Sequence, residues 1–119
     1  MSPAQWARLR KDVDCGLRRG AWYLTLGRER SAIVIEVAGR RRLFPRSLFE
    51  IASITPSQWT IVSHAGNQHL LPARWSKGYA VCPCCKSRQL ILGHPTTMRC
   101  ERCEERFEIA WDERYLSTN

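Results

Sequence analysis

Two pairs of cysteines at fixed spacing constrain this chain more than any other feature of its sequence. Residues 82–85 read Cys-Pro-Cys-Cys, and after fourteen further residues 100–103 read Cys-Glu-Arg-Cys. Two residues between cysteines let the backbone turn tightly enough for both sulfurs to face one point. Four thiolates arranged in this way surround a divalent ion tetrahedrally at about 2.3 Å, the usual geometry of a structural zinc site. We therefore expect one structural Zn²⁺ bound by Cys82, Cys85, Cys100 and Cys103.

Other chemistries remain open for the same four cysteines. A pair of disulfides or a redox-active pair is an alternative, although no βαβ pattern of the thioredoxin type surrounds either pair. Rubredoxin-like iron also uses two such pairs, but nothing else in the chain indicates electron transfer. His94 becomes a ligand only if it displaces a cysteine. The remaining cysteines, Cys15 and Cys84, are expected to be free thiols.

Residues 79–111 resemble the zinc-ribbon family. The resemblance rests on the four paired cysteines, on Pro83, and on a strand–turn–strand pattern between the two pairs. The sequence departs from many ribbons at Lys86 and Glu104, where those ribbons carry Gly after the second cysteine of a pair. Zinc ribbons occur in transcription, translation and DNA-processing proteins and also as structural staples. The resemblance therefore implies a metal without naming a partner.

The first 64 residues are expected to form a domain that opens with a helix. Ser2 suits the N-cap, Pro3 suits the first helical position, and Gly16 or Gly20 suits the exit. Four apolar residues share one face at helical spacing: Trp6, Leu9, Val13 and Leu17. Short β-rich runs follow at residues 21–26, 31–37, 41–44, 49–52 and 58–62. Their close spacing predicts a small five-stranded antiparallel barrel similar to an SH3-like barrel, with an OB-like barrel or a curled open sheet as alternatives.

The sequence between the two halves is interrupted by Gly and Pro, which predicts a linker at residues 65–78. The expected organisation is thus a helix and barrel over residues 1–64, the linker, and a zinc ribbon over residues 79–119. The predicted fold class is mainly β.

Basic residues are concentrated in the first of these domains. The chain holds 19 Lys and Arg against 11 Asp and Glu, a net charge of +8, and 16 of the basic residues are Arg. Residues 1–64 hold 11 basic against 5 acidic side chains, whereas residues 65–119 hold 8 against 6. Arginine's planar guanidinium suits phosphate, so the excess favours an anionic partner. The candidate nucleic-acid contacts are the arginines of the helix exit and the hairpins, with one exposed tryptophan for base stacking: Arg18, Arg19, Arg28, Arg30, Arg40, Arg42 and Trp75.

The sequence offers no pattern typical of an enzyme. It shows no nucleophile–base arrangement, carboxylate dyad or Gly-rich phosphate loop, so we expect neither catalysis nor a small-molecule substrate. No apolar run approaches the roughly 18 residues needed to cross a bilayer and no secretion signal is visible, so we expect a cytoplasmic protein without a membrane partner. The leading hypothesis is a nucleic-acid-associated protein that binds DNA or RNA through arginine–phosphate contacts, as an accessory subunit of a transcription, translation or DNA-processing assembly. A protein-interaction adaptor on a larger complex is the alternative, and an iron–thiolate electron carrier is a third hypothesis.

Overall fold

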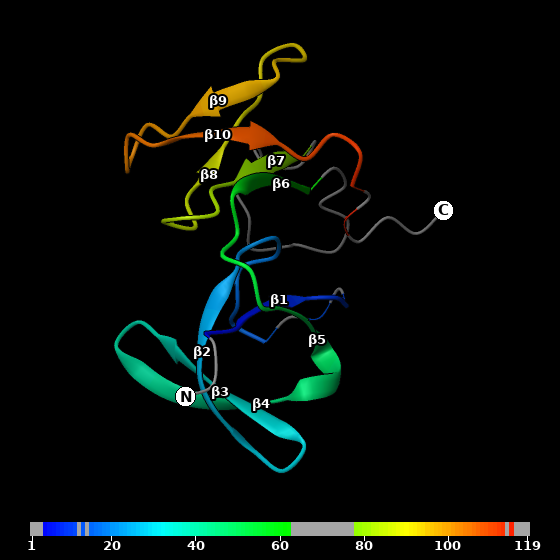
Figure 1. Ribbon diagram of the computed structural model, residues 1–119, viewed down its shortest axis with the longest axis vertical. Helices are drawn as coiled ribbons and strands as arrows, with labels where there is room; N and C mark the ends of the chain where they lie inside the picture. Colours follow the sequence, from blue (N-terminus) through cyan, green and yellow to red (C-terminus); the bar gives the residue numbers. More distant parts are fainter. Residues whose placement is uncertain (1–3, 12, 14, 63–77, 114, 116–119) are drawn as a thin grey trace. The chain divides into compact units, whose positions relative to one another are not determined.

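The computed structural model describes residues 4–11, 13, 15–62, 78–113 and 115, which form two β units (Figure 1). The first unit spans residues 1–56 and the second spans residues 57–119. Each unit contains one five-stranded sheet. Among the described residues the only helical segment is a single 3₁₀ turn, η1 (Arg46–Leu48). The chain is therefore mainly β, as predicted. The predicted linker lies, except for Gly78, outside the described residues.

The first sheet is antiparallel throughout, with the strand order β4-β3-β2-β1-β5. Its strands are β1 (Trp6–Leu9), β2 (Tyr23–Glu29), β3 (Ala32–Val37), β4 (Arg40–Pro45) and β5 (Phe49–Ala52). Strand β2 is shared by two halves of the sheet, because its first residues pair with β1 and its later residues pair with β3. The pairing shifts between Thr25 and Gly27, where a β-bulge lets the strand bend. The bent sheet encloses a core that includes Leu9, Ile35 and Phe49.

The predicted N-terminal helix is wrong, because its first apolar residues form strand β1 instead. Strand β1 pairs with β2 on one side and β5 on the other, so neighbouring strands satisfy its backbone. Gly16 and Gly20 both have φ near +86°, a conformation that suits a helix exit, but the described residues before them are not helical. Leu17 is buried as the apolar pattern requires, but it lies in the segment between β1 and β2. The helical spacing therefore predicted burial correctly at Leu9 and Leu17, whereas Trp6 and Val13 are half-buried and no helix forms.

The two faces of β1 have different chemistry. Ala7 and Leu9 are fully buried in the core of the first unit. On the other face, a nitrogen of the Arg8 guanidinium donates to the Glu50 carboxylate at 2.6 Å, and the guanidinium lies 4.5 Å from the centre of the Trp22 ring. Only 4% of the Arg8 side chain is exposed. This arginine is therefore part of the packing of the sheet.

The second sheet has the strand order β8-β7-β6-β10-β9. Its strands are β6 (Gln58–Val62), β7 (Tyr79–Val81), β8 (Arg88–Gln89), β9 (Thr97–Arg99) and β10 (Arg106–Ile109). All neighbouring strands are antiparallel except the central pair, β6 and β10, which run parallel. The strands that follow the two cysteine pairs, β8 and β10, lie on opposite sides of the central strand β6.

Strand β6 corrects the predicted barrel, which had assigned residues 58–62 as its fifth strand. The structure instead pairs β6 with β7 and β10 in the second sheet. Trp59 explains this choice, because its side chain is fully buried beside Ala80, Ile109 and the buried cysteines. Its indole N–H donates to the Met98 carbonyl at 2.9 Å. The predicted set of five strands was therefore wrong in two places. Strand β1, predicted as a helix, belongs to the first sheet, and β6, predicted in the first sheet, belongs to the second.

We predict that Trp59→Phe selectively destabilises the second unit. The substitution removes the indole donor of the Met98 carbonyl, a part-buried hydrogen bond whose loss costs about 1–3 kcal/mol in the free energy of unfolding. Hydrogen exchange of individual amides in the full chain should show faster exchange in β6, β7 and β10, with β2–β4 unchanged. Trp22→Phe is the matched control and should affect only the first unit. Faster exchange of β2–β4 in Trp59→Phe would contradict the placement of this residue.

Candidate metal centre

Four cysteine sulfurs converge on one point in the second unit. The sulfurs of Cys82, Cys85, Cys100 and Cys103 all lie within 4.8 Å of one another. The Sγ–Sγ distance is 3.7 Å between Cys82 and Cys103 and 3.5 Å between Cys85 and Cys100. Four thiolates about 2.3 Å from a tetrahedral ion lie about 3.8 Å apart. The sulfur positions therefore fit a tetrahedral ion, and the cluster can bind a metal.

The two cysteine pairs occupy equivalent turns. The first turn connects β7 to β8 and the second connects β9 to β10. In the first, the Cys82 N–H donates to the Ser87 carbonyl at 2.9 Å, and in the second the Cys100 N–H donates to the Glu105 carbonyl at 2.8 Å. The same backbone bond thus closes both turns five residues after the first cysteine. Each turn brings its two sulfurs to the same side, as the two-residue spacing predicted.

Lys86 and Glu104 follow the second cysteine of each pair and adopt the left-handed backbone conformation. Their φ values are 66° and 67°. This conformation costs a residue with a side chain about 1–2 kcal/mol, which explains why Gly is common there in ribbons. Both N–H groups nevertheless donate back to the carbonyl of the first cysteine, at 3.2 Å in the first turn and 2.9 Å in the second. Both turns therefore close without glycine.

The segment between the two turns does not form the predicted hairpin. Strands β8 and β9 lie at opposite edges of the sheet and pair with β7 and β10. The side chain of Gln89 joins these edges, because its Nε2 donates to the Arg99 carbonyl and its Oε1 accepts from the Glu101 N–H, both at 3.0 Å. Sequence reasoning missed this contact, since an amide in a short polar run carries no signal of its partner.

Burial and hydrogen bonds give the sulfurs different environments. Cys82 and Cys100 are fully buried in the core around Trp59, whereas Cys85 and Cys103 are half-buried. Burial raises the pKa of the Cys82 thiol above its usual range. Burial also acts to raise the pKa of Cys100, but hydrogen bonds from backbone N–H groups and from the Ser87 hydroxyl outweigh it and lower the pKa to about 6. These hydrogen bonds favour the thiolate of Cys100, the form that binds metals.

The other candidate ligands lie away from the four sulfurs. Cys84 is exposed and contributes its backbone N–H, which lies 3.4 Å from the Cys82 sulfur. Cys15 is half-buried in the first unit. The ring of His94 stacks on Trp111 with 3.7 Å between the ring centres. None of the three belongs to the sulfur cluster.

The structure places the predicted nucleic-acid contacts in different environments. Arg18 and Arg19 are half-buried in the segment between β1 and β2, and Arg30 is exposed in the turn that follows β2. Arg42 is exposed, although its guanidinium lies 4.9 Å from the centre of the Phe44 ring and donates to the Cys15 carbonyl at 3.5 Å. Trp75 lies outside the described residues.

Arg28, Arg40 and Arg42 share one face of the first sheet. They pair across the sheet with Ile33, Val37 and Ile35 of β3, and directly paired residues of an antiparallel sheet point to the same side. Arg28 and Arg40 are exposed and pair with residues near opposite ends of β3. Arg41 pairs with Glu36 and points to the other face. The alternation of β4 thus separates Arg40 from Arg41.

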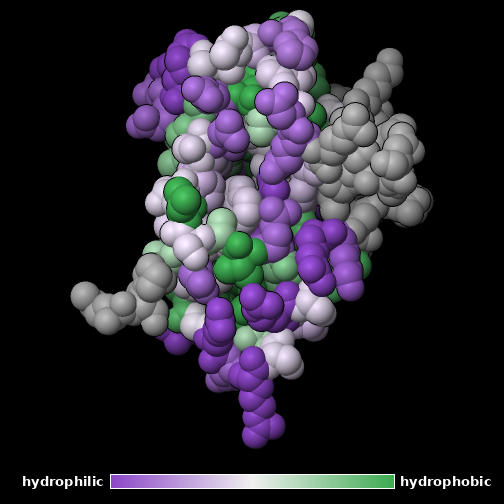
Figure 2. Space-filling view, turned by 45° about the vertical axis from the view of Figure 1, so that its right-hand side comes forward, coloured by the Kyte–Doolittle hydropathy of each residue, from purple (hydrophilic) through white to green (hydrophobic). Residues whose placement is uncertain are grey.

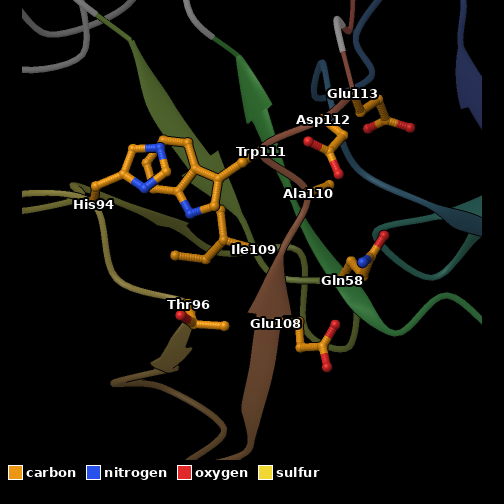
Figure 3. A pocket seen from close by; sticks show the side chains of 9 residues that line it. All are labelled: Gln58, His94, Thr96, Glu108, Ile109, Ala110, Trp111, Asp112 and Glu113. Atoms are coloured by element: carbon orange, nitrogen blue, oxygen red, sulfur yellow. The ribbon is translucent and has the colours of Figure 1, made fainter.

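An open cavity of about 640 Å³ lies on the second unit (Figure 3). The stacked rings of His94 and Trp111 form one side of it, and the indole N–H of Trp111 donates to the Pro95 carbonyl at 2.7 Å. The lining also includes Glu108, Asp112 and Glu113. Three carboxylates repel phosphate, so this cavity is unsuited to a nucleic-acid backbone.

No family model, curated protein or solved structure matches this chain. The described residues also contain no helix long and apolar enough to span a bilayer. Conclusions about function therefore rest on the geometry of the chain itself.

We predict that Cys84→Ser retains full metal content and that Cys85→Ser does not. The two residues are adjacent, but only the Cys85 sulfur belongs to the cluster. Elemental analysis of dialysed full-length protein should give one metal per chain for the wild type and Cys84→Ser. Loss of metal in Cys84→Ser with retention in Cys85→Ser would show that the first pair is assigned incorrectly.

Proposed function

We propose that the second unit binds one structural Zn²⁺ through Cys82, Cys85, Cys100 and Cys103, and that the chain is a non-enzymatic nucleic-acid-associated protein. The convergence of the four sulfurs carries the first part of this proposal. Four thiolates complete a tetrahedral shell and leave no position for a water or substrate, so the ion has a structural role. The soft sulfur set suits zinc, and iron is the other metal that this set accommodates.

The ion would link two turns that the sequence places far apart. Cys82 and Cys100 belong to the core of the second unit, so the metal and the core depend on the same backbone positions. Structural zinc contributes about 10–16 kcal/mol of apparent binding free energy at neutral pH. That range is comparable to the total stability of a typical domain, which is about 5–15 kcal/mol. We infer that folding of the second unit requires the ion.

We predict that purified wild-type protein contains one zinc per chain and that Cys100→Ser loses both the zinc and the fold of the second unit. Elemental analysis gives the metal, and hydrogen exchange in β6–β10 reports the fold. Cys15→Ser is the matched control, because this cysteine lies in the first unit and should leave zinc and fold unchanged. A colourless protein without metal would contradict the proposal. One iron per chain, with the red colour of iron–thiolate proteins, would support the electron-carrier hypothesis instead.

The nucleic-acid part of the proposal is supported by the charge of the first unit. Residues 1–56 hold 11 basic and 5 acidic side chains, against 8 and 6 in residues 57–119. Arg28 and Arg40 are exposed on the same face of the sheet and pair with β3 residues four positions apart, a span of about 13 Å along an extended strand. Phosphates follow one another along a strand of nucleic acid, so an extended arrangement of this kind suits a backbone better than a single anion. This arrangement suits the backbone of either DNA or RNA, and it is compatible with a role as an accessory subunit of a larger assembly.

A protein-interaction adaptor is the second candidate, supported by exposed apolar side chains. Leu43 is 57% exposed on β4, and Leu92 is 88% exposed between β8 and β9. Figure 2 shows hydrophobic side chains exposed among hydrophilic ones on the face in view. Exposed leucines of this kind are typical of surfaces that contact another protein when they gather into a patch.

We predict that Arg40→Gln weakens binding to DNA or RNA more than Arg41→Gln. The two substitutions remove the same charge from adjacent residues of β4 but on opposite faces. Loss of one phosphate contact should reduce the slope of log affinity against log salt by about 0.9 for duplex DNA and about 0.7 for a single strand. Titrations of duplex DNA, single-stranded DNA and RNA at several salt concentrations measure both quantities.

Equal weakening by the two variants would indicate a general charge effect and contradict contact through this face. Negligible affinity of the wild type for all three nucleic acids at about 0.15 M salt would overturn the nucleic-acid proposal and favour the adaptor.

A further inference from the structure

The hydroxyl of Ser87 lies between two sulfurs of the metal-binding cluster. Its Oγ is 3.1 Å from the Cys85 sulfur and 3.3 Å from the Cys100 sulfur. These two sulfurs belong to different turns, so the hydroxyl contacts both halves of the site. The Ser87 carbonyl accepts the Cys82 N–H at 2.9 Å, which fixes the backbone from which the side chain projects.

We propose that Ser87 is a positioning residue that shares its single hydroxyl proton between the metal-bound thiolates of Cys85 and Cys100 in one three-centre hydrogen bond and thereby strengthens metal binding. The proposal rests on the proposed zinc site and deepens it. A metal-bound thiolate carries no proton, so in the loaded site the hydroxyl can only donate and the sulfurs can only accept. A bound metal therefore makes Ser87 the donor, whereas with neutral thiols either the hydroxyl or the sulfur could donate.

The charge of the loaded site explains why a donor is useful there. Four thiolates and one divalent cation carry a net charge of −2, and burial of such a charge requires polar compensation. The sulfurs that come first in each pair receive backbone donors: the Cys84 N–H lies 3.4 Å from Cys82, and the Cys103 N–H lies 3.5 Å from Cys100. Within the described part of the chain, the side-chain hydroxyl that faces Cys85 is that of Ser87.

The equivalence of the two turns shows that this hydroxyl is not required to form a turn. Glu105 occupies the position of Ser87 in the second turn and accepts the corresponding backbone bond from Cys100. Its side chain is exposed. The backbone function of this position is thus common to both turns, and the Glu105 backbone also hydrogen-bonds to the Cys103 sulfur, whereas the side-chain contact with the sulfurs belongs to Ser87. Glu105 therefore provides a matched control.

The test measures zinc affinity of the full chain by competition with a chromophoric chelator. Ser87→Ala should weaken zinc binding about 10–100-fold, the usual effect of removing a group that hydrogen-bonds to a metal ligand. Ser87→Thr keeps the hydroxyl and should bind within a few-fold of the wild type. Glu105→Ala should bind as the wild type does. Substitution with Co²⁺ adds a spectroscopic readout, because loss of the hydrogen bond should move the thiolate-to-cobalt charge-transfer band to longer wavelength in Ser87→Ala alone.

Three results would overturn the inference. Unchanged affinity and an unchanged Co²⁺ spectrum in Ser87→Ala would show that the hydroxyl does not act on the bound metal. Equal weakening in Ser87→Ala and Ser87→Thr would assign the effect to packing. A wild-type chain that binds neither Zn²⁺ nor Co²⁺ would overturn the proposed site and this inference together, which distinguishes that failure from failure of the Ser87 contact alone.

Discussion

The meeting of four cysteine sulfurs at one point determines how the second unit is built. Strands β7 and β9 end where the cysteine turns begin, and β8 and β10 start where the turns close. The turns use the same backbone bonds, so the unit contains two similar strand–turn–strand halves. Strand β6 separates these halves in the sheet, and its Trp59 fills the space between the buried cysteines and the apolar strands. Cys82 and Cys100 therefore belong both to the sulfur cluster and to the core of the second unit.

In the first unit, the arginines differ in how far they face solvent. Arg8 is buried against Glu50 and Trp22, whereas Arg42 is exposed although its guanidinium lies over the Phe44 ring. Arg28 and Arg40 remain exposed on the shared face. The net charge of the chain therefore overstates the charge available to a partner, because a buried, paired guanidinium contributes little to the field outside. The charge that a partner meets is therefore set by the individual exposed arginines.

Local features were predictable from the sequence, and long-range pairing was not. The cysteine spacing identified all four clustered sulfurs because each pair is set by a turn of a few residues. Alternating patterns located strands at 32–37 and 58–62 but could not choose their partners, so β6 was assigned to the wrong sheet. The spacing of the apolar residues from Trp6 onward suits a helix. In the folded chain the first of these residues form β1, because β2 and β5 pair with them. Ser87 and Gln89 gave no signal, because a polar side chain acquires its role only from a partner brought near by folding.

The parallel pairing of β6 with β10 has a consequence for the order of events during synthesis. Gln58 pairs with Glu108, fifty positions later in the chain, whereas every strand of the first sheet is complete by Ala52. The first sheet can therefore assemble as soon as its last strand leaves the ribosome. The central strand of the second sheet must wait for nearly all of the remaining chain, with the apolar surface of Trp59 uncovered meanwhile. A metal ion that meets the first cysteine pair in this interval finds only two of the four clustered sulfurs, so tight binding of a metal and completion of the sheet become late events.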